Sequence, residues 1–422
     1  MKTKLISIFA LAIMMASCSN QELINSDFQQ SASQQTSSIR SYEEALQIAQ
    51  ASIQMVDGQA QTRAASPRKI SLTDSKVCLT GSKTRSENGN DTLMYVFNFE
   101  DNQGFAVVSA NKATEGLIAI TGSGNYNPDE PSEIDGFNLY MDLVKKYIAS
   151  RGPGLDPILP DGRDSFAVEF NYAGPYVTVN WGQTYPEGEF CSNGICGCSN
   201  TAIAQIMSYY EYPSGTPITY PNHDVYYQSF NWTQMKAHQT GHVRYDNSCS
   251  SDDIHTSIGR LCRQSGYIAE SYYAQDYTST TLSGKKSALQ FFGYNTNDWT
   301  YYSNASIKDT IDAGCPMIIC GWDPTVSDIG HAWVMDGYME KVSLHYWISH
   351  PIVGSNIEIA ELIDTNYTYY YHFNWGWYGW NNGYFLYNVF DTDNGLYDSS
   401  NHVNINFNFN STVQILCPHP IN

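Results

Sequence analysis

Apolar residues recur at helical spacing in three segments of the chain. Residues 41–49 (SYEEALQIA) place a serine before an early glutamate and an apolar face, a pattern typical of a capped helix start. Residues 137–148 repeat aromatic and aliphatic side chains at the spacing of one buried face, and this segment stops at RGPG over residues 151–154. Residues 199–210 show the same periodicity and end before Pro213. Each segment therefore predicts a helix.

Short apolar runs between the first two predicted helices indicate strands. They cover residues 93–99 (LMYVFNF), 104–110 (GFAVVSA) and 117–121. The sequence DNQG at residues 101–104 supplies turn residues for a hairpin between the first two runs. Residues 41–151 are therefore predicted to form a small α+β domain of their own.

Polar segments divide the rest of the chain. Residues 19–40 are rich in Ser and Gln, which is typical of a flexible spacer, and residues 152–165 are a linker rich in Gly, Pro and Asp. Residues 166–422 then predict one larger domain. It holds all ten histidines, so any imidazole chemistry belongs to it.

The N-terminus has the pattern of an export signal. Lys2 and Lys4 precede an apolar run over residues 5–16, which is too short for a permanent membrane span. Small residues directly before Cys18 resemble the cleavage site of a bacterial lipoprotein signal, with a plain secretory peptide as the alternative. Residues 1–18 thus predict an exported protein, periplasmic or at the outer membrane or cell surface. A lipid on Cys18 would tether the protein to a membrane, with release of the mature protein from that membrane as the alternative.

Composition and charge exclude several classes of partner. The 422-residue chain has a net charge of −20, only 15% charged residues and no block of Lys or Arg. Phosphate binding needs a concentrated basic surface, so neither a nucleic acid nor an anionic lipid surface is an expected partner. The chain shows no internal repeat and no glycine-rich phosphate loop. Its membrane contact is expected only through the anchor at Cys18.

Three of the ten cysteines lie together in CSNGICGCSN at residues 191–200. Nine cysteines would remain after a lipidated Cys18 is set aside, too few for a disulfide scaffold in a chain of this size. Cys191, Cys196 and Cys198 lack a recognisable fourth ligand and the C-x2-C spacing, so no zinc site is expected and no cofactor is predicted. Cys191 and Cys196 remain either a local disulfide or two reduced neighbours.

Cys198 stands at the start of a predicted helix. Ser199 and Asn200 are natural capping types, and the partial positive charge of a helix N-terminus stabilises a thiolate and lowers its pKa. Gly197 would let a substrate backbone come close. A buried structural thiol is the alternative for Cys198 taken alone.

Two distant motifs favour a nucleophile over a structural thiol. GHAWVMDGY at residues 330–338 begins an apolar strand with His331, a candidate base. HFNWGWYGWNNGYF at residues 372–385 contributes Asn374, whose amide could accept a hydrogen bond from the imidazole. Cysteine, histidine and asparagine in this order and at long separation are typical of papain-like peptidases.

Together these motifs resemble the streptopain family of bacterial cysteine peptidases. The GFAVVSA strand and the SYEEALQIA helix are similar to that family's propeptide, so the resemblance covers nearly the whole chain beyond the spacer. It implies an α+β zymogen: a small inhibitory propeptide domain over residues 41–151, then a two-lobed papain-like domain with a helical lobe and an antiparallel sheet lobe.

The resemblance also assigns roles to residues. It implies that Cys198 is the nucleophile and His331 the general base, while Asn374 and Trp375 orient the histidine and line the site. Gln183, in NWGQ at residues 180–183, would hold the oxyanion together with the backbone N–H of Cys198.

The chain departs from the family's pattern at three places. Cys191 and Cys196 flank the nucleophile, where extra thiols are not expected. About thirty residues separate Tyr338 from His372, where a short hairpin would be usual, so this insert is expected to reshape the cleft rim or bind a partner. Tyr378 stands where a glycine would be usual and is expected to narrow the site.

We therefore predict an exported cysteine endopeptidase made as a zymogen. The Cys198 thiolate would attack a peptide carbonyl, His331 would protonate the leaving amine, and water would hydrolyse the thioester. Its partners would be protein or peptide substrates and its own propeptide, which would cover the cleft or displace His331. Maturation would need a cut near Lys146, Arg151 or Arg163. The alternatives are a catalytically inactive papain-like surface-binding or adhesion protein, and a thiol acyl transferase on the same triad.

Overall fold

The structure is a computed structural model. It describes residues 38–59, 68–79, 92–151, 163–219, 225–237, 252–297, 300–301, 304–321, 330–349, 359–389, 396–398, 403–405 and 413–421. The predicted signal over 1–18 with Cys18, most of the spacer over 19–40 and most of the linker over 152–165 lie outside the described residues. Within the described ranges, no helix combines the length and the apolar character that a membrane crossing requires.

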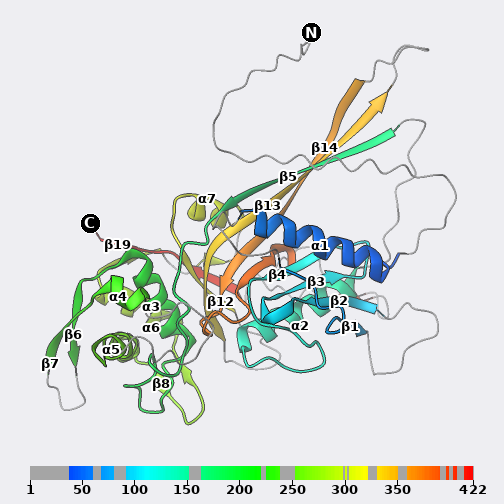
Figure 1. Cartoon of the computed structure of the whole chain (residues 1–422). Coiled ribbons are helices and arrows are strands. Elements are labelled where there is room, and N and C mark those ends of the chain that lie inside the picture. Colours follow the sequence, from blue (N-terminus) through cyan, green and yellow to red (C-terminus); the bar gives the residue numbers. More distant parts are fainter. Residues whose placement is uncertain are drawn as a thin grey trace, which may run out of the picture.

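The N-terminal part of the chain forms a four-stranded antiparallel meander with two helices (Figure 1). Its elements are α1 (Tyr42–Gln59), β1 (Lys76–Leu79), β2 (Thr92–Asn98), a short 3-10 helix (Glu100–Asn102), β3 (Phe105–Ser109), β4 (Leu117–Thr121) and α2 (Asp135–Ser150). The cap predicted for the first helix is present, since Glu44 N donates to Ser41 Oγ at 3.2 Å and Ser41 N donates to Glu44 Oε2 at 2.7 Å. We refer to residues 38–151 as the N-terminal unit.

A second group of helices forms a separate lobe (Figure 1). It contains α3 (Cys198–Tyr210), α4 (Trp232–Ala237), α5 (Asp252–Ile268) and α6 (Leu282–Phe291). This part of the molecule also contains short two-stranded sheets, which pair β6 (Gly215–Thr219) with β7 (Val225–Ser229), β8 (Tyr272–Tyr273) with β9 (Thr278–Ser279), and β10 (Tyr294–Thr296) with β19 (Pro418–Pro420). Helix α7 (Asn304–Asp312) lies beside β13, and the described residues near the C-terminus include a further strand pair, β16 (Leu396–Asp398) and β17 (Val403–Ile405).

One large antiparallel sheet runs through both parts of the molecule. Its order is β1-β2-β3-β4-β15-β14-β13-β12-β18-β11, and β5 also pairs with β13. The strands of the C-terminal part are β5 (Arg163–Ala173), β11 (Thr300–Tyr301), β12 (Met317–Gly321), β13 (His331–Ser349), β14 (Ile359–Asn374), β15 (Gly383–Leu386) and β18 (Val413–Leu416), with a short 3-10 helix (Tyr387–Val389) after β15. The molecule therefore has the predicted α+β class, with a helical lobe against an antiparallel sheet.

The junction between β4 and β15 makes the two parts continuous. Thr121 pairs with Gly383, and the ladder continues through Ile120 with Tyr384 and Ala119 with Phe385. The sequence suggested a small unit with its own sheet and gave no indication of this pairing. The consequence is that the N-terminal unit is attached by backbone hydrogen bonds as well as by side-chain packing.

Alternation along β13 divides the interior into two cores. Ala332 and Val334 belong to the core under the helical lobe, whereas Trp333 and Met335 belong to a core shared with the N-terminal unit. This is the period of two expected for a strand buried on both faces. The start of β13 is therefore packed from both sides, which fixes the position of its first residue, His331.

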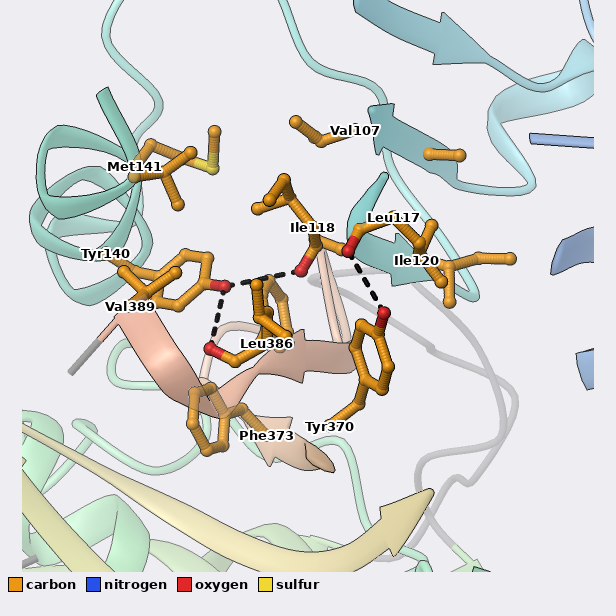
Figure 2. Packing of buried hydrophobic residues seen from close by; sticks show 14 of the residues in the cluster. Val107, Leu117, Ile118, Ile120, Tyr140, Met141, Tyr370, Phe373, Leu386 and Val389 are labelled. Carbon is orange, nitrogen blue, oxygen red and sulfur yellow. Dashed lines mark hydrogen bonds between the residues drawn. The ribbon is translucent and has the colours of Figure 1, made fainter. Parts of the chain in front are cut away.

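Hydrogen bonds inside the shared core connect the N-terminal unit to the sheet (Figure 2). The hydroxyl of Tyr140 on α2 donates to the carbonyl of Leu386 at 3.3 Å or of Ile118 at 3.4 Å. The hydroxyl of Tyr370 on β14 donates to the carbonyl of Leu117 at 3.1 Å. Both tyrosines are buried, so these bonds satisfy groups that would otherwise be costly to bury.

The insert between Tyr338 and His372 extends β13 and β14 into a long arm that projects from the body, and β5 pairs with β13 as the third strand of this arm (Figure 1). Leu362, Ile363 and Tyr367 on this arm are about half exposed. The arm therefore places apolar side chains in solvent at a distance from the body of the molecule.

Candidate active site

A cleft lies where the N-terminus of α3 meets the ends of β12 and β13. Its volume is about 550 Å³. Four of the five predicted site residues line it, namely Cys198, His331, Gln183 and Trp375. Residues 133–136 of the N-terminal unit, just before and at the start of α2, line the same cleft.

Helix α3 presents Cys198 to the cleft through a tight turn. Gly197 has φ of 86°, and a side chain there would meet the carbonyl of Thr278, so glycine is required at this position. The helix begins at Cys198 itself, and Ser199 and Asn200 lie in its first turn instead of capping it. Asn200 instead donates its Nδ2 to the carbonyl of Cys196 at 2.8 Å, which holds the preceding loop against the helix.

Electrostatics at the cleft favour a charged pair. Burial raises the pKa of the Cys198 thiol, but a hydrogen bond to His331, the charge of His331 and that of Lys285 outweigh it and lower the pKa to about 7. Burial lowers the pKa of His331, yet contact with Cys198 and the charge of Asp135 raise it overall. Both shifts act in the direction of a thiolate beside an imidazolium.

Gln183 lies on the loop opposite Cys198. Its carbonyl accepts a hydrogen bond from Cys196 N at 2.8 Å, so the two loops that flank Cys198 are tied together. Gln183 lines the cleft together with Cys198.

Trp375 is 3% exposed and forms part of the cleft wall beside His331. Its ring packs on Trp333 with centroids 5.1 Å apart and on Phe137 of the N-terminal unit at 6.1 Å. Its Nε1 donates to the carbonyl of Asn381 at 3.1 Å, which fixes the plane of the indole. Trp375 thus connects the cleft wall to the shared core.

Asn374 is not brought to His331, which corrects the expectation that its amide orients the imidazole. It ends β14 opposite Val334, three residues along β13 from His331, or roughly 10 Å of strand. Its Nδ2 donates to the carbonyl of Val179 at 2.9 Å, and its Oδ1 accepts from Gln205 Nε2 at 3.1 Å and Gly376 N at 3.2 Å. Through its hydrogen bond with Gln205, Asn374 therefore holds the middle of α3 in place.

Tyr378 also differs from expectation, because it does not narrow the cleft. It is buried and its ring packs against Gly182, while its hydroxyl accepts from Thr184 N at 2.9 Å. Its φ of 56° lies in the left-handed region, which explains why glycine would be the common residue there. Tyr378 therefore supports the Gln183 loop from behind.

The other cysteines of the CSNGICGCSN segment differ chemically from Cys198. Cys191 and Cys196 are both buried and both are free thiols in this structure. Burial, with the nearby Cys196, raises the pKa of Cys191 to about 12, so it stays protonated. Among the residues that the structure describes, no group of three or more His, Cys, Asp or Glu side chains could hold a metal ion.

The histidine of the second motif, His372, lies outside the cleft. Its Nδ1 is 2.6 Å from Oδ1 of the fully buried Asp336, and Asp336 Oδ2 accepts from Val177 N at 2.7 Å. This pair fastens β13 and β14 to the segment that follows β5. It is a structural feature of the sheet lobe.

Sequence reasoning missed the charged groups that line the cleft, among them the two that act on the Cys198–His331 pair. Asp135 at the start of α2 comes from the N-terminal unit, and no local pattern shows that it faces His331. Lys285 on α6 precedes Ala288 and Leu289 by three and four positions, so helical spacing would have placed it on the buried face. That periodicity was a usable signal for Lys285.

Comparisons with known proteins match both parts of the chain. A model of the peptidase C10 family matches residues 170–385, just over half of the chain, and a model described as Spi protease inhibitor matches residues 32–148. Streptopain of Streptococcus pyogenes is 24% identical over 335 residues, which cover 69% of this chain and 73% of streptopain. Thiol protease/hemagglutinin PrtT of Porphyromonas gingivalis is 21% identical over 71% of this chain and 34% of its own length.

Among solved structures, a fragment of Prevotella intermedia prointerpain A is similar with a TM-score of 0.48 and 20% identity. The match covers 81% of this chain and 98% of that fragment.

Proposed function

Because this chain belongs to the peptidase C10 family and carries a Spi-type inhibitor segment, it is a cysteine-type peptidase with a propeptide, and we propose how its residues act. The observation that carries the proposal is the hydrogen-bonded pair of Cys198 and His331 in the cleft. Protein or peptide substrates are its partners, and the N-terminal unit is its intramolecular inhibitor.

We propose an acyl-enzyme mechanism for internal peptide bonds. The Cys198 thiolate attacks the scissile carbonyl, and the backbone N–H of Cys198 with the Gln183 side chain stabilises the oxyanion. His331 gives its proton to the leaving amine as the C–N bond breaks, which leaves a thioester. His331 then takes a proton from water, and the hydroxide releases the product acid and the thiolate.

Two further residues would act through the pair of Cys198 and His331. Trp375 would shield His331 from water through its place in the cleft wall. Asn374 would hold α3 in position through Gln205, a positioning role in place of the imidazole-orienting role expected from the sequence. Both assignments follow from packing around the cleft.

Labelling tests this function directly. The processed protein should bind an irreversible epoxide inhibitor of thiol peptidases, and mass analysis of its peptides should place the label on Cys198. It should also cut casein and release free peptides, not cross-linked amides. A processed protein that takes no label and leaves casein intact would refute the peptidase mechanism.

We expect a bell-shaped dependence of kcat/KM on pH. The acidic limb should rise through about pH 7, where the thiolate of Cys198 forms, because the pKa of this thiol is lowered to about 7. The alkaline limb should fall as His331 loses its proton, above the ordinary imidazole pKa of about 6.5, because that pKa is raised. Asp135 contributes to this increase in the pKa of His331. Removal of Asp135 with the propeptide should therefore move the alkaline limb to lower pH.

Measurement of kcat/KM for a fluorogenic peptide across pH 4–10 checks this profile. An acidic limb at the ordinary thiol value of about 8.5 would contradict the ion pair.

The N-terminal unit would inhibit by occupying the cleft. Residues 133–136 line it, and Gly136 packs so closely on Trp375 that an added Cβ would lie 3.0 Å from the indole ring. Of the three basic residues suggested for maturation, Lys146 lies inside α2 and Arg163 is paired in β5, whereas Arg151 directly follows the helix. Peptidases cut extended backbone, so we propose the cut after Arg151.

We propose that the protein is exported and lipid-anchored at Cys18. Expression in a bacterial host with an alkyne-tagged fatty acid should label the wild-type protein and place it in the membrane fraction. Cys18→Ser should lose both the label and the membrane association, because the thiol that carries the lipid is gone. Cys315→Ser, at a half-buried thiol of the folded part, is the control and should keep both. An unlabelled wild-type protein in the soluble fraction would refute the anchor.

A further inference from the structure

One wall of the cleft carries a buried lysine that the proposed mechanism does not use. Lys285 lies in the first half of α6, is 5% exposed and lines the cleft with Cys198 and His331. Its Nζ donates to the carbonyl of Thr280 at 2.7 Å. This neutral acceptor orients the ammonium without neutralising it.

Among the described residues, the charge on Lys285 has no carboxylate partner. Across the described ranges of the chain, no aspartate or glutamate forms an ion pair with it. A buried ammonium is costly unless an anion compensates it. In the free enzyme that anion is the Cys198 thiolate, whose pKa Lys285 helps to lower.

Acylation removes this compensation. When the Cys198 sulfur forms a thioester it becomes neutral, so the ammonium of Lys285 then faces only the bound acyl group. Because the sulfur loses its charge as the C–S bond forms, a carboxylate on the substrate would supply the missing negative charge from the transition state of acylation onward, the step that kcat/KM reports. A neutral substrate would leave the ammonium uncompensated.

The inhibitory segment already brings carboxylates into this space. Glu133 and Asp135 line the cleft while the N-terminal unit is in place. The other lining carboxylate, Asp276, is exposed at the rim, where water screens it. Removal of the propeptide therefore takes away two of the three acidic residues that line the cleft and leaves Lys285 behind.

We propose that Lys285 is a specificity-determining residue that selects substrates with Asp or Glu beside the scissile bond. The proposal rests on the peptidase function above and names its substrate class. Thr280, Thr281 and Leu282 line the cleft together with Lys285, and the Thr280 carbonyl holds the ammonium in place, so a carboxylate on a bound substrate would meet a fixed positive charge there.

Paired peptides test this specificity on the mature enzyme. Fluorogenic peptides that carry Glu or its neutral isostere Gln, at each of the three positions on either side of the bond, give a ratio of kcat/KM. The wild-type ratio should exceed about 10 at one position, because a charge-assisted hydrogen bond replaces a neutral one. Lys285→Met should bring this ratio to about 1, and Lys285→Arg should keep most of it.

The ratio within one enzyme is the informative quantity, because an altered Cys198 ionisation affects both peptides equally. Lys286→Met is the matched control: it removes the neighbouring charge on α6, at a residue that does not line the cleft, and should leave the ratio unchanged. Active-site titration with the epoxide counts folded enzyme, so a poorly folding variant is recognised.

The outcomes separate the two proposals. An enzyme that labels and cuts casein but shows a Glu/Gln ratio near 1 at every position overturns the role of Lys285 alone. Retention of the wild-type ratio in Lys285→Met overturns it as well. Absence of labelling and of casein cleavage overturns the peptidase mechanism instead.

Discussion

Replacement of Cys198 by alanine is expected to abolish peptide hydrolysis, with kcat/KM lowered by at least about 10⁴-fold. No other thiol in the described part of the chain can take its place. Cys320 lines the same cleft, but burial raises its pKa to about 11, so it stays protonated. Hydrolysis of casein and of a fluorogenic peptide by the purified variant measures the loss.

The same variant reports on maturation. If the propeptide is removed by the enzyme itself, the Cys198→Ala protein should remain full length while the wild-type protein is shortened. N-terminal sequencing of both gives the cut site, which we place after Arg151; because no Asp or Glu lies within three residues of that bond, a cut made there by the enzyme itself would count against the acidic preference proposed for Lys285. Cys315→Ala, at a half-buried thiol outside the cleft, should mature and cut casein like the wild type. A Cys198→Ala protein with near wild-type turnover would assign the nucleophile elsewhere.

A cut in the linker alone is expected to leave the enzyme inactive. With a recognition site for a specific protease inserted between residues 152 and 162, the nicked protein should elute as one species and show about 1% or less of the mature activity. The reason is that the N-terminal unit keeps its β4–β15 pairing and its share of the core after the cut. If the N-terminal unit remains bound to the nicked protein with a free energy of about 2.7 kcal/mol, the cleft is closed in about 99% of the molecules.

The attachment can be weakened at one residue to test this reasoning. Gly136→Val places a branched side chain against the rings of Trp375 and Trp333, where an added Cβ already lies at 3.0 Å and 3.6 Å. The nicked Gly136→Val protein should therefore release its N-terminal unit and become active, while nicked wild-type protein should not. Full activity of the nicked wild-type protein would mean that the linker, and not the packed interface, holds the enzyme closed.

Local sequence patterns predicted the parts of the site that depend on short-range structure. The cap of α1, the helix that begins at Cys198 and the strand that begins at His331 all follow from neighbouring residues. The meeting of Cys198 and His331 was inferred from a family resemblance and the order of the motifs. Their separation along the chain carries no geometric information by itself.

Features set by strand register could not be predicted in the same way. Asn374 stands next to Trp375 in the chain, yet its partner in the register is Val334, and its amide faces α3. Tyr378 could be a cleft residue or a support, and only the packing on Gly182 decides. In both cases the sequence identifies the residue, and the pairing of distant segments determines what it contacts.

The inserted arm shows another limit of sequence reasoning. The extra residues between Tyr338 and His372 were expected to act at the rim of the cleft or to bind a partner. None of the described residues of the insert lines the cleft, because β13 and β14 continue straight past the body. No secondary structure was assigned to the insert from its sequence, so neither its strands nor their direction was predicted.

The shared sheet has a consequence for the handling of the processed protein. While β4 is in place, the backbone of β15 is paired on both sides, and Phe385 packs on Tyr140 with centroids 5.0 Å apart. Loss of the N-terminal unit would turn β15 into an open edge strand beside freshly uncovered aromatic rings, a recognised cause of self-association. Solutions of the precursor should therefore tolerate concentration and storage better than solutions of the mature enzyme.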